Sequence, residues 1–264
     1  MLPKLFSIGT FYLPTYGLLV ALGFLAGLTV AVRLARRSGL NPELVTNLAV
    51  YCALAGLLGA KILMIVFDWH YFMTDPAQIF SRSTLQAAGV FQGGLVLAFA
   101  TAVLYIQRTG LPPLVTLDVF APGIAIGHAI GRIGCFAAGC CWGTETRLPW
   151  AVTFHNPDAN ALTGVPLEIP LHPSQLYEMG TELALFALLY VLFARPHAPG
   201  KIMGLYLVLS SAARFAIEFT RYHQQGLHFG LSLTQWISVG FALGGAWLLL
   251  RRWAPAQLKP SVAT

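Results

Sequence analysis

The chain has 264 residues, of which 56% are hydrophobic and only 10% are charged, and its formal net charge is +6. A soluble domain carries roughly 25% charged residues, so this chain has too few to cover a water-facing surface and a lipid-facing one is expected. The basic residues lie in short clusters at the ends of apolar runs, which argues against a nucleic-acid-binding protein. Composition therefore predicts an all-α integral membrane protein.

Seven apolar runs come close to the roughly 20 residues that a helix needs to cross the hydrocarbon. They are Leu13–Val32, Val45–Phe67, Ala88–Ile106, Leu114–Gly131, Ser174–Ala194, Lys201–Phe219 and Leu231–Leu250. The fourth is interrupted by Asp118, Pro122 and His128, so a re-entrant or partly interior helix is an alternative there. We expect one membrane domain of about seven transmembrane helices over residues 1–253, followed by a disordered Pro/Ala/Ser-rich tail at 254–264.

Basic residues lie at alternate ends of these runs. The richer set is Arg33, Arg36, Arg37, Arg108, Arg195, Lys201, Arg251, Arg252 and Lys259; the poorer set is Lys4, Arg82 and Arg147. Because cytoplasmic loops are enriched in Lys and Arg, we expect the N-terminus outside and the C-terminus in the cytoplasm. The longest hydrophilic stretch, Thr144–Pro173, would then lie on the outer face of a cell membrane.

Three arginines lie in apolar context. An ionisable residue at membrane depth is costly and marks a functional site by default, and the planar guanidinium fork matches phosphate. Arg214, Glu218 and Arg221 have the spacing of one helical stripe, so Glu218 could hold both guanidinium groups of an anion clamp. A purely structural ion-pair ladder at a helix end is the alternative.

Arg132 lies in a glycine-rich segment. Gly127 and Gly131 precede it on a small-residue face that lets another backbone approach closely. Gly134, Gly139 and Gly143 follow, which predicts an irregular segment with backbone N–H groups free for an oxyanion or a phosphate.

The run His172-Pro-Ser-Gln-Leu-Tyr-Glu178 opens the fifth apolar run. Ser174 is a good N-cap, and Tyr177 and Glu178 fall on the first turn of the predicted helix. A simple helix cap with an interfacial tyrosine is the alternative to a functional role.

These motifs, in this order and together with the Tyr16-Gly17 pair, resemble bacterial prolipoprotein diacylglyceryl transferases from Tyr16 to about Trp236. The shared patterns are H-P-S-Q-L-Y-E, G-R-I-G-x-F-x-x-G-x-x-W-G and R-F-x-x-E-F-x-R. The resemblance implies an enzyme that moves a diacylglyceryl group from phosphatidylglycerol to the thiol of a lipobox cysteine in exported preprolipoproteins. A thioether forms and glycerol phosphate leaves, without a metal or an organic cofactor.

The resemblance also implies roles for particular residues. Arg132 and Arg214 match the essential arginines of the family. The substrate-binding residues would be Tyr16, Lys61, Gln92, Gly93, Gly94, Gly131, Gly143, Tyr177, Glu178, Glu218 and Arg221.

The chain departs from the family pattern where a proton acceptor would be needed. The family reads Phe-His-Gly-Gly in the third run, whereas this chain has Gln92, which cannot take up a proton at neutral pH. Lys61 replaces an arginine and so loses its fork. His128, one turn before Arg132, and His172 are the candidate catalytic bases, although a lone intramembrane histidine is more often a packing residue.

Three cysteines cluster near the outer end, where the family has Asn at 135 and Glu at 140. Cys135, Cys140 and Cys141 could be small packing residues, a structural disulfide or a reactive thiol. A bridge between neighbours would be strained, so a disulfide would join Cys135 to one of the other two. Their spacing does not indicate a metal site.

Two other functions remain open. One is a divergent relative that transfers a lipid-derived group to another acceptor. The other is a non-enzymatic lipid or anion transporter, although we see no symmetry between two halves of the kind that transporters favour.

Overall fold

The computed structural model describes residues 2–8, 11–81, 84, 89–222, 227 and 229–251. It is mostly helical, as composition predicts, and among the described residues five helices are long and apolar enough to cross a membrane. They are Thr15–Arg37, Pro42–Phe67, Pro113–Ala138, Ser174–Phe193 and Leu233–Leu250. The chain is therefore an integral membrane protein of the all-α class. The predicted disordered tail at 254–264 lies outside the described residues.

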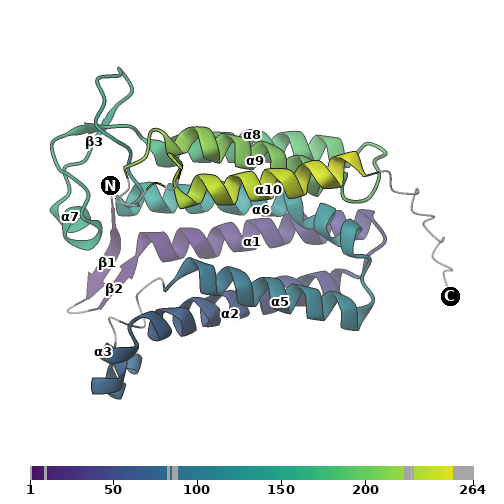
Figure 1. Cartoon of the computed structure of the whole chain (residues 1–264), viewed down its shortest axis with the longest axis horizontal. Coiled ribbons are helices and arrows are strands. Elements are labelled where there is room, and N and C mark those ends of the chain that lie inside the picture. Colours follow the sequence, from purple (N-terminus) through teal and green to yellow (C-terminus); the bar gives the residue numbers. More distant parts are fainter. Residues whose placement is uncertain are drawn as a thin grey trace. The chain divides into compact units, whose positions relative to one another are not determined.

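The chain divides into two compact units (Figure 1). The first comprises Met1–Leu34 and Leu117–Thr264, and the second comprises Ala35–Thr116.

The first unit holds most of the helices and two small sheets. Its elements are β1 (Lys4–Ile8), β2 (Phe11–Pro14), α1 (Thr15–Arg37), α6 (Pro113–Ala138), β3 (Val152–Thr153), α7 (Pro157–Thr163), β4 (Pro170–Leu171), α8 (Ser174–Phe193), α9 (Lys201–Glu218) and α10 (Leu233–Leu250). Strands β1 and β2 form an antiparallel hairpin, as do β3 and β4, and α9 packs against both α8 and α10. Figure 1 shows the strands and α7 gathered at one end of this unit.

Glycines set the distance between α1 and α6. A Cβ atom built on Gly123 would lie 2.6 Å from the carbonyl oxygen of Gly27, and one on Gly23 would lie 2.8 Å from that of Gly127. The two backbones are therefore nearly in contact, as small residues allow in membrane helices.

Helix α6 runs without a break through Pro122 and past Arg132, so the fourth apolar run is one continuous helix. More of it is buried than of the other four candidate spans, which agrees with the partly interior alternative. Its buried Asp118 accepts hydrogen bonds from the amides of Gly200 (2.6 Å) and Met203 (2.8 Å) and so caps the start of α9.

The segment between α6 and α8 has a small core of its own. Phe154, Ala159, Val165 and Leu171 are buried there, and Trp142 packs against them. This core gives the long hydrophilic stretch between α6 and α8 a defined fold.

The second unit contains α2 (Pro42–Phe67), α3 (Trp69–Thr74), the 3₁₀ helix η1 (Pro76–Phe80) and α5 (Phe91–Thr109). Helices α2 and α5 pack against each other. A Cβ atom on Gly93 would lie 2.3 Å from the carbonyl oxygen of Gly59, and one on Gly94 would lie 2.7 Å from that of Gly56.

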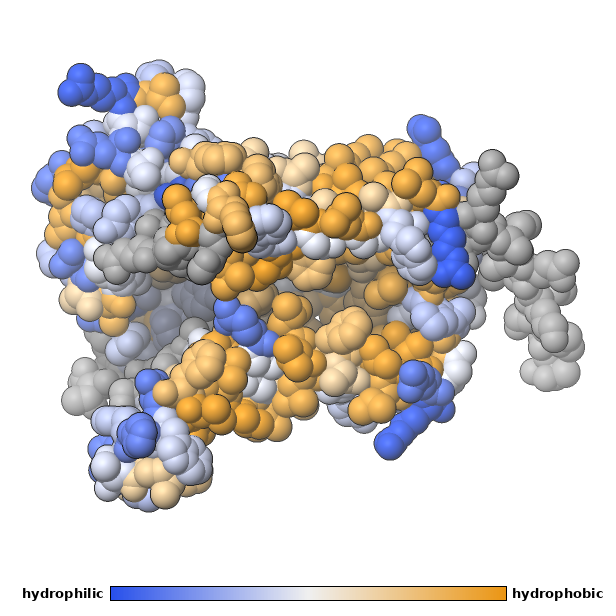
Figure 2. Space-filling view, in the orientation of Figure 1, coloured by the Kyte–Doolittle hydropathy of each residue, from blue (hydrophilic) through white to orange (hydrophobic). Residues whose placement is uncertain are grey.

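Apolar side chains face outward along the helices. Figure 2 shows hydrophobic residues along the length of α9 and α10, with hydrophilic residues gathered toward the helix ends. Leu243 is 67% exposed although it lies in the middle of α10. Such a surface requires lipid to cover it.

Candidate functional site

The Glu178 carboxylate forms ion pairs with two arginines that lie on other parts of the chain. Glu178 is buried and lies near the start of α8. Its Oε2 is 2.6 Å from Nη2 of Arg132, which belongs to α6. Arg221, which follows α9, places Nη1 3.3 Å from Oε1. A carboxylate has two oxygens that can accept such charge-assisted bonds, so one buried side chain fixes two arginines.

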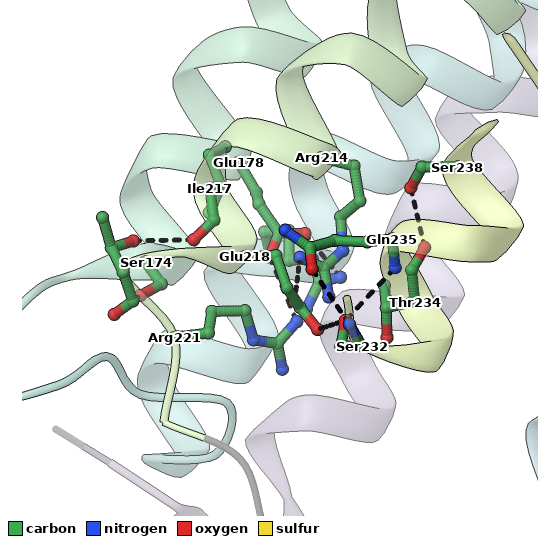
Figure 3. A network of polar contacts seen from close by, with 12 residues as sticks. Ser174, Glu178, Arg214, Ile217, Glu218, Arg221, Ser232, Thr234, Gln235 and Ser238 are labelled. Atoms are coloured by element: carbon green, nitrogen blue, oxygen red, sulfur yellow. Dashed lines mark hydrogen bonds and ion pairs between the residues drawn. The ribbon is translucent and has the colours of Figure 1, made fainter. Parts of the chain in front are cut away.

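A second pair lies where α9 ends. Arg214 Nη1 is 2.7 Å from Oε2 of Glu218, one helical turn further on. The Ser232 hydroxyl donates to Oε1 of Glu218 over 2.8 Å and also caps the amide of Gln235 at the start of α10. Figure 3 shows Glu178, Arg214, Glu218 and Arg221 gathered around this point.

The predicted single stripe of Arg214, Glu218 and Arg221 is wrong in one respect. Helix α9 ends at Glu218, so Arg221 leaves the helical register and its backbone pairs with Gly143 instead. Its side chain then reaches Glu178, while Glu218 binds Arg214. The clamp is therefore built from two carboxylates on two helices.

His128 lies within the same network. Its Nε2 accepts a hydrogen bond from Nε of Arg132 over 3.2 Å, and its Nδ1 is 3.1 Å from Oε1 of Glu182. Sequence reasoning missed Glu182, although a carboxylate inside an apolar run, one turn after Glu178, was a usable signal.

His172 and Tyr177 form a separate group nearer the hydrophilic segment. The His172 Nδ1 is 3.2 Å from the Tyr177 hydroxyl, which also accepts a bond from the Trp150 indole over 2.8 Å. Trp150 is a further residue that the sequence did not indicate.

The predicted N-cap role of Ser174 is wrong. Ser174 is the first residue of α8 itself, and its hydroxyl lies 3.5 Å from the carbonyl oxygen of Thr220. The start of α8 instead holds the chain that follows α6, because Gln175 Nε2 donates a hydrogen bond to the carbonyl of Cys140 over 2.7 Å.

The predicted irregular glycine segment begins later than expected. Gly131 and Gly134 lie inside α6, which continues to Ala138. The chain leaves the helix at Gly139, whose φ of 79° is in the left-handed region. Gly143 has no room for a side chain, because a Cβ atom there would lie 2.4 Å from the Cβ of His172.

Open space adjoins Arg132. A Cβ atom on Gly131 would meet nothing within 4 Å, and Tyr16 of α1 lies against Gly134, with its ring 3.3 Å from the Cβ position there. The structure thus brings Tyr16 to the same end of α6 as Arg132.

All four cysteines are free thiols, so the disulfide alternative has no support in the structure. Cys135 lies 3.9 Å from Nη1 of Arg132. Hydrogen bonds from the Cys135 and Cys140 thiols lower the pKa of Cys141, and nearby Arg221 and Arg132 act in the same direction.

The remaining predicted residues lie in the second unit. Gln92 is exposed, whereas Gly93 and Gly94 hold α5 against α2, which gives them a packing role there. The Lys61 ammonium donates to the carbonyl of Thr84. Their part in the site stays a prediction.

Charge and exposure differ between the two kinds of partner. The side chains of Glu178, Glu182 and Glu218 are 3–6% exposed, whereas those of the three arginines are 15–20% exposed. Each guanidinium has five N–H donors, more than its contact with one carboxylate uses. The buried carboxylates therefore hold partly exposed arginines whose remaining donors suit an anion such as a phosphate.

A family model described as prolipoprotein diacylglyceryl transferase matches residues 3–251. The chain belongs to the prolipoprotein diacylglyceryl transferase family. Among its relatives are phosphatidylglycerol–prolipoprotein diacylglyceryl transferases of Nitratidesulfovibrio vulgaris (35% identical over 97% of this chain and 95% of the relative) and Methylobacillus flagellatus (33%, 94% and 95%). Another, from Clostridium tetani, is 30% identical over 90% of this chain and 93% of the relative. The matched range of residues 3–251 covers nearly the whole chain and spans the site described above.

Proposed function

We propose that this chain transfers a diacylglyceryl group from phosphatidylglycerol to the thiol of a lipobox cysteine in exported preprolipoproteins. The observation that carries the proposal is the group of three arginines held by buried glutamates in a member of this family. In the reaction, the thiol sulfur forms a bond to the glyceryl carbon while the bond from that carbon to the phosphate oxygen breaks. Glycerol phosphate leaves and the thiol proton passes to a base.

The arginines stabilise the charge of the leaving group. Negative charge grows on the phosphate as the carbon–oxygen bond breaks, and prearranged donors that meet this charge lower the barrier. Arg132 and Arg214 supply such donors, and Glu178 and Glu218 keep the guanidinium groups oriented before substrate arrives. Arg221 is the third arginine of the network and contacts Oε1 of Glu178, the oxygen that Arg132 does not use.

His128 is the better placed of the two candidate bases. Its Nδ1 lies 3.1 Å from Glu182, which orients the ring, and its Nε2 would take up the thiol proton in place of the hydrogen bond that it accepts from Arg132. His172 instead lies against Tyr177, in a contact that orients the hydrophilic segment. This assignment supplies the proton acceptor that Gln92 cannot be.

We further propose seven transmembrane helices in a bacterial inner membrane, with the N-terminus outside and the active site toward the outer leaflet. The helix ends that carry the site, at Arg132, Glu178 and Glu218, are opposite to the ends of α6, α8 and α9 that lie beside Arg108, Arg195 and Lys201. Arg36 and Arg37, for example, lie in the last turn of α1, whereas Tyr16 lies in its first turn.

The test is a transfer assay with the purified protein in liposomes and a lipobox peptide, with the thioether product measured by mass spectrometry. Product is expected with phosphatidylglycerol liposomes but not with phosphatidylethanolamine liposomes or with a peptide whose lipobox cysteine is serine. Removing one such donor costs about 10²–10³ in rate, so Arg132→Ala and Arg214→Ala should each lose at least that much. Arg147→Ala, at an exposed arginine of the hydrophilic segment, is the matched control.

Two other outcomes would contradict the proposal. Phosphatidylglycerol binding with no thioether would indicate a different acceptor or a transporter. Equal product from Arg132→Ala and Arg147→Ala would mean that the arginine network has no part in the chemistry.

A further inference from the structure

Three thiols converge where α6 ends. The sulfur atoms of Cys135, Cys140 and Cys141 all lie within 4.8 Å of one another, although the sequence spacing did not indicate a metal site. The chain reverses at Gly139, and the amide of Cys140 donates to the carbonyl of Cys135 over 3.1 Å. This turn folds the two later thiols back over the last turn of the helix.

Contacts from other elements fix the turn. The Thr163 hydroxyl of α7 donates to the carbonyl of Gly139 over 3.1 Å, and Gln175 of α8 donates to that of Cys140 over 2.7 Å. Cys141 has a φ of 62°, an uncommon conformation for a residue with a side chain. The backbone that carries the thiols is therefore held in place by its surroundings.

The spacing of the sulfurs fits a bound metal ion. Metal–thiolate bonds are about 2.3 Å long, so three sulfurs around one ion lie about 4 Å apart, and the cluster needs to contract by less than about 1 Å. A disulfide would instead require two sulfurs to approach to about 2.05 Å. Cys135 is buried and the other two thiols are partly buried, which protects an occupied site from bulk water.

The ligand set selects the kind of ion. Among the described residues this group contains only cysteines, with no histidine or carboxylate. Soft thiolates select soft ions such as Cu(I), whereas zinc favours four ligands in structural sites. Three thiolates and one monovalent ion leave two negative charges, and two cations are close by. Arg132 Nη1 lies 3.9 Å from the sulfur of Cys135, and the charges of both Arg221 and Arg132 act on the Cys141 thiol.

We propose that Cys135, Cys140 and Cys141 together bind one Cu(I) ion as a three-thiolate site. On binding, three S–H groups release their protons to solvent, three metal–sulfur bonds form and the oxidation state of the ion does not change. The proposal does not depend on the transferase reaction, because it follows from the thiol geometry alone.

The test is a titration of the reduced, full-length protein in detergent with Cu(I), against a coloured Cu(I) chelator as competitor and without oxygen. We expect one ion per chain, with each of Cys135→Ser, Cys140→Ser and Cys141→Ser weakening the affinity by at least tenfold. Cys52→Ser is the matched control, since Cys52 is not a member of the thiol group, and it should leave the affinity unchanged. X-ray absorption of the copper complex should show three sulfur neighbours.

Several results would overturn the proposal. They are failure to compete with the chelator, equal affinity in the triple serine variant, and dependence on only two of the cysteines. The proposal would also be overturned by X-ray absorption that shows nitrogen or oxygen bound to copper, or by tighter binding of Zn(II) than of Cu(I). A disulfide within the cluster in protein purified without reductant would overturn it too. Thermal unfolding of each variant without metal separates loss of the site from loss of the fold.

Discussion

At the scale of single residues, Glu178 is the group on which the arginine network depends. Its conversion to glutamine would remove a buried charge that two guanidinium groups contact, leaving Arg132 and Arg221 without their partner. Breaking a buried ion pair from one side costs about 3–5 kcal/mol. We therefore expect Glu178→Gln to lower the thermal unfolding midpoint in detergent strongly, whereas Glu145→Gln, at an exposed glutamate, should hardly change it. Similar midpoints for the two variants would show that the stability of the fold does not depend on the Glu178 charge.

His128 leads to a second prediction at this scale. A general base contributes about 10²–10⁴ in rate, so His128→Gln should lower the transfer rate at neutral pH by at least 10². A free thiol ionises with a pKa of about 8.5, so above that pH the acceptor cysteine is already a thiolate and needs no base. The defect should therefore shrink as the pH rises past that value. A defect independent of pH, or a larger one in His172→Gln, would show that His128 is not the base.

The sequence indicated most charged residues of this network but not how they pair. Arg214 and Glu218 are one turn apart on one helix, so their contact follows from spacing alone. The bond between Arg132 and Glu178 joins two helices, and its existence depends on how α6 and α8 pack. Arg221 was assigned the wrong partner because its partner changes once α9 ends.

At the scale of elements, the contact of α1 with α6 is the most sensitive to side-chain size. Gly123→Ala would place a methyl group 2.6 Å from the carbonyl of Gly27, which forces the helices apart. Overpacking of this kind costs about 1–3 kcal/mol, so we expect a lower unfolding midpoint. In Gly240→Ala, the added Cβ atom in α10 would have no neighbour within 4 Å. This variant should raise the midpoint slightly, because alanine favours a helix by about 1 kcal/mol over glycine. A reversed order of the two midpoints would contradict the packing described here.

Helix ends were harder to predict than helices. Apolar runs located the long helices, but α6 continues past Gly131 and Gly134 to Ala138. Gly139 ends it by adopting a left-handed conformation, and nothing in the sequence separates this glycine from the earlier two. Its carbonyl is held by Thr163, a contact between residues far apart in the chain.

At the scale of the whole molecule, the proposed topology can be tested with reporters. An enzyme active only outside the cytoplasm should work when fused within residues 146–149, and a fluorescent protein that folds only in the cytoplasm should work after Thr264 or within residues 110–112. These results follow from seven spans with the N-terminus outside, which place the basic loops inside. Reporter activity on the same side for the fusions at 110–112 and 146–149 would mean that α6 does not cross the membrane.

In the proposed function, the arginine network couples departure of glycerol phosphate to formation of a thioether. The most direct measurement is the ratio of glycerol phosphate released to thioether peptide formed by the purified protein in phosphatidylglycerol liposomes. We expect a ratio of one to one, with both products lost together in Arg132→Ala. Glycerol phosphate released without the matching thioether, or transport of lipid with neither product, would contradict it.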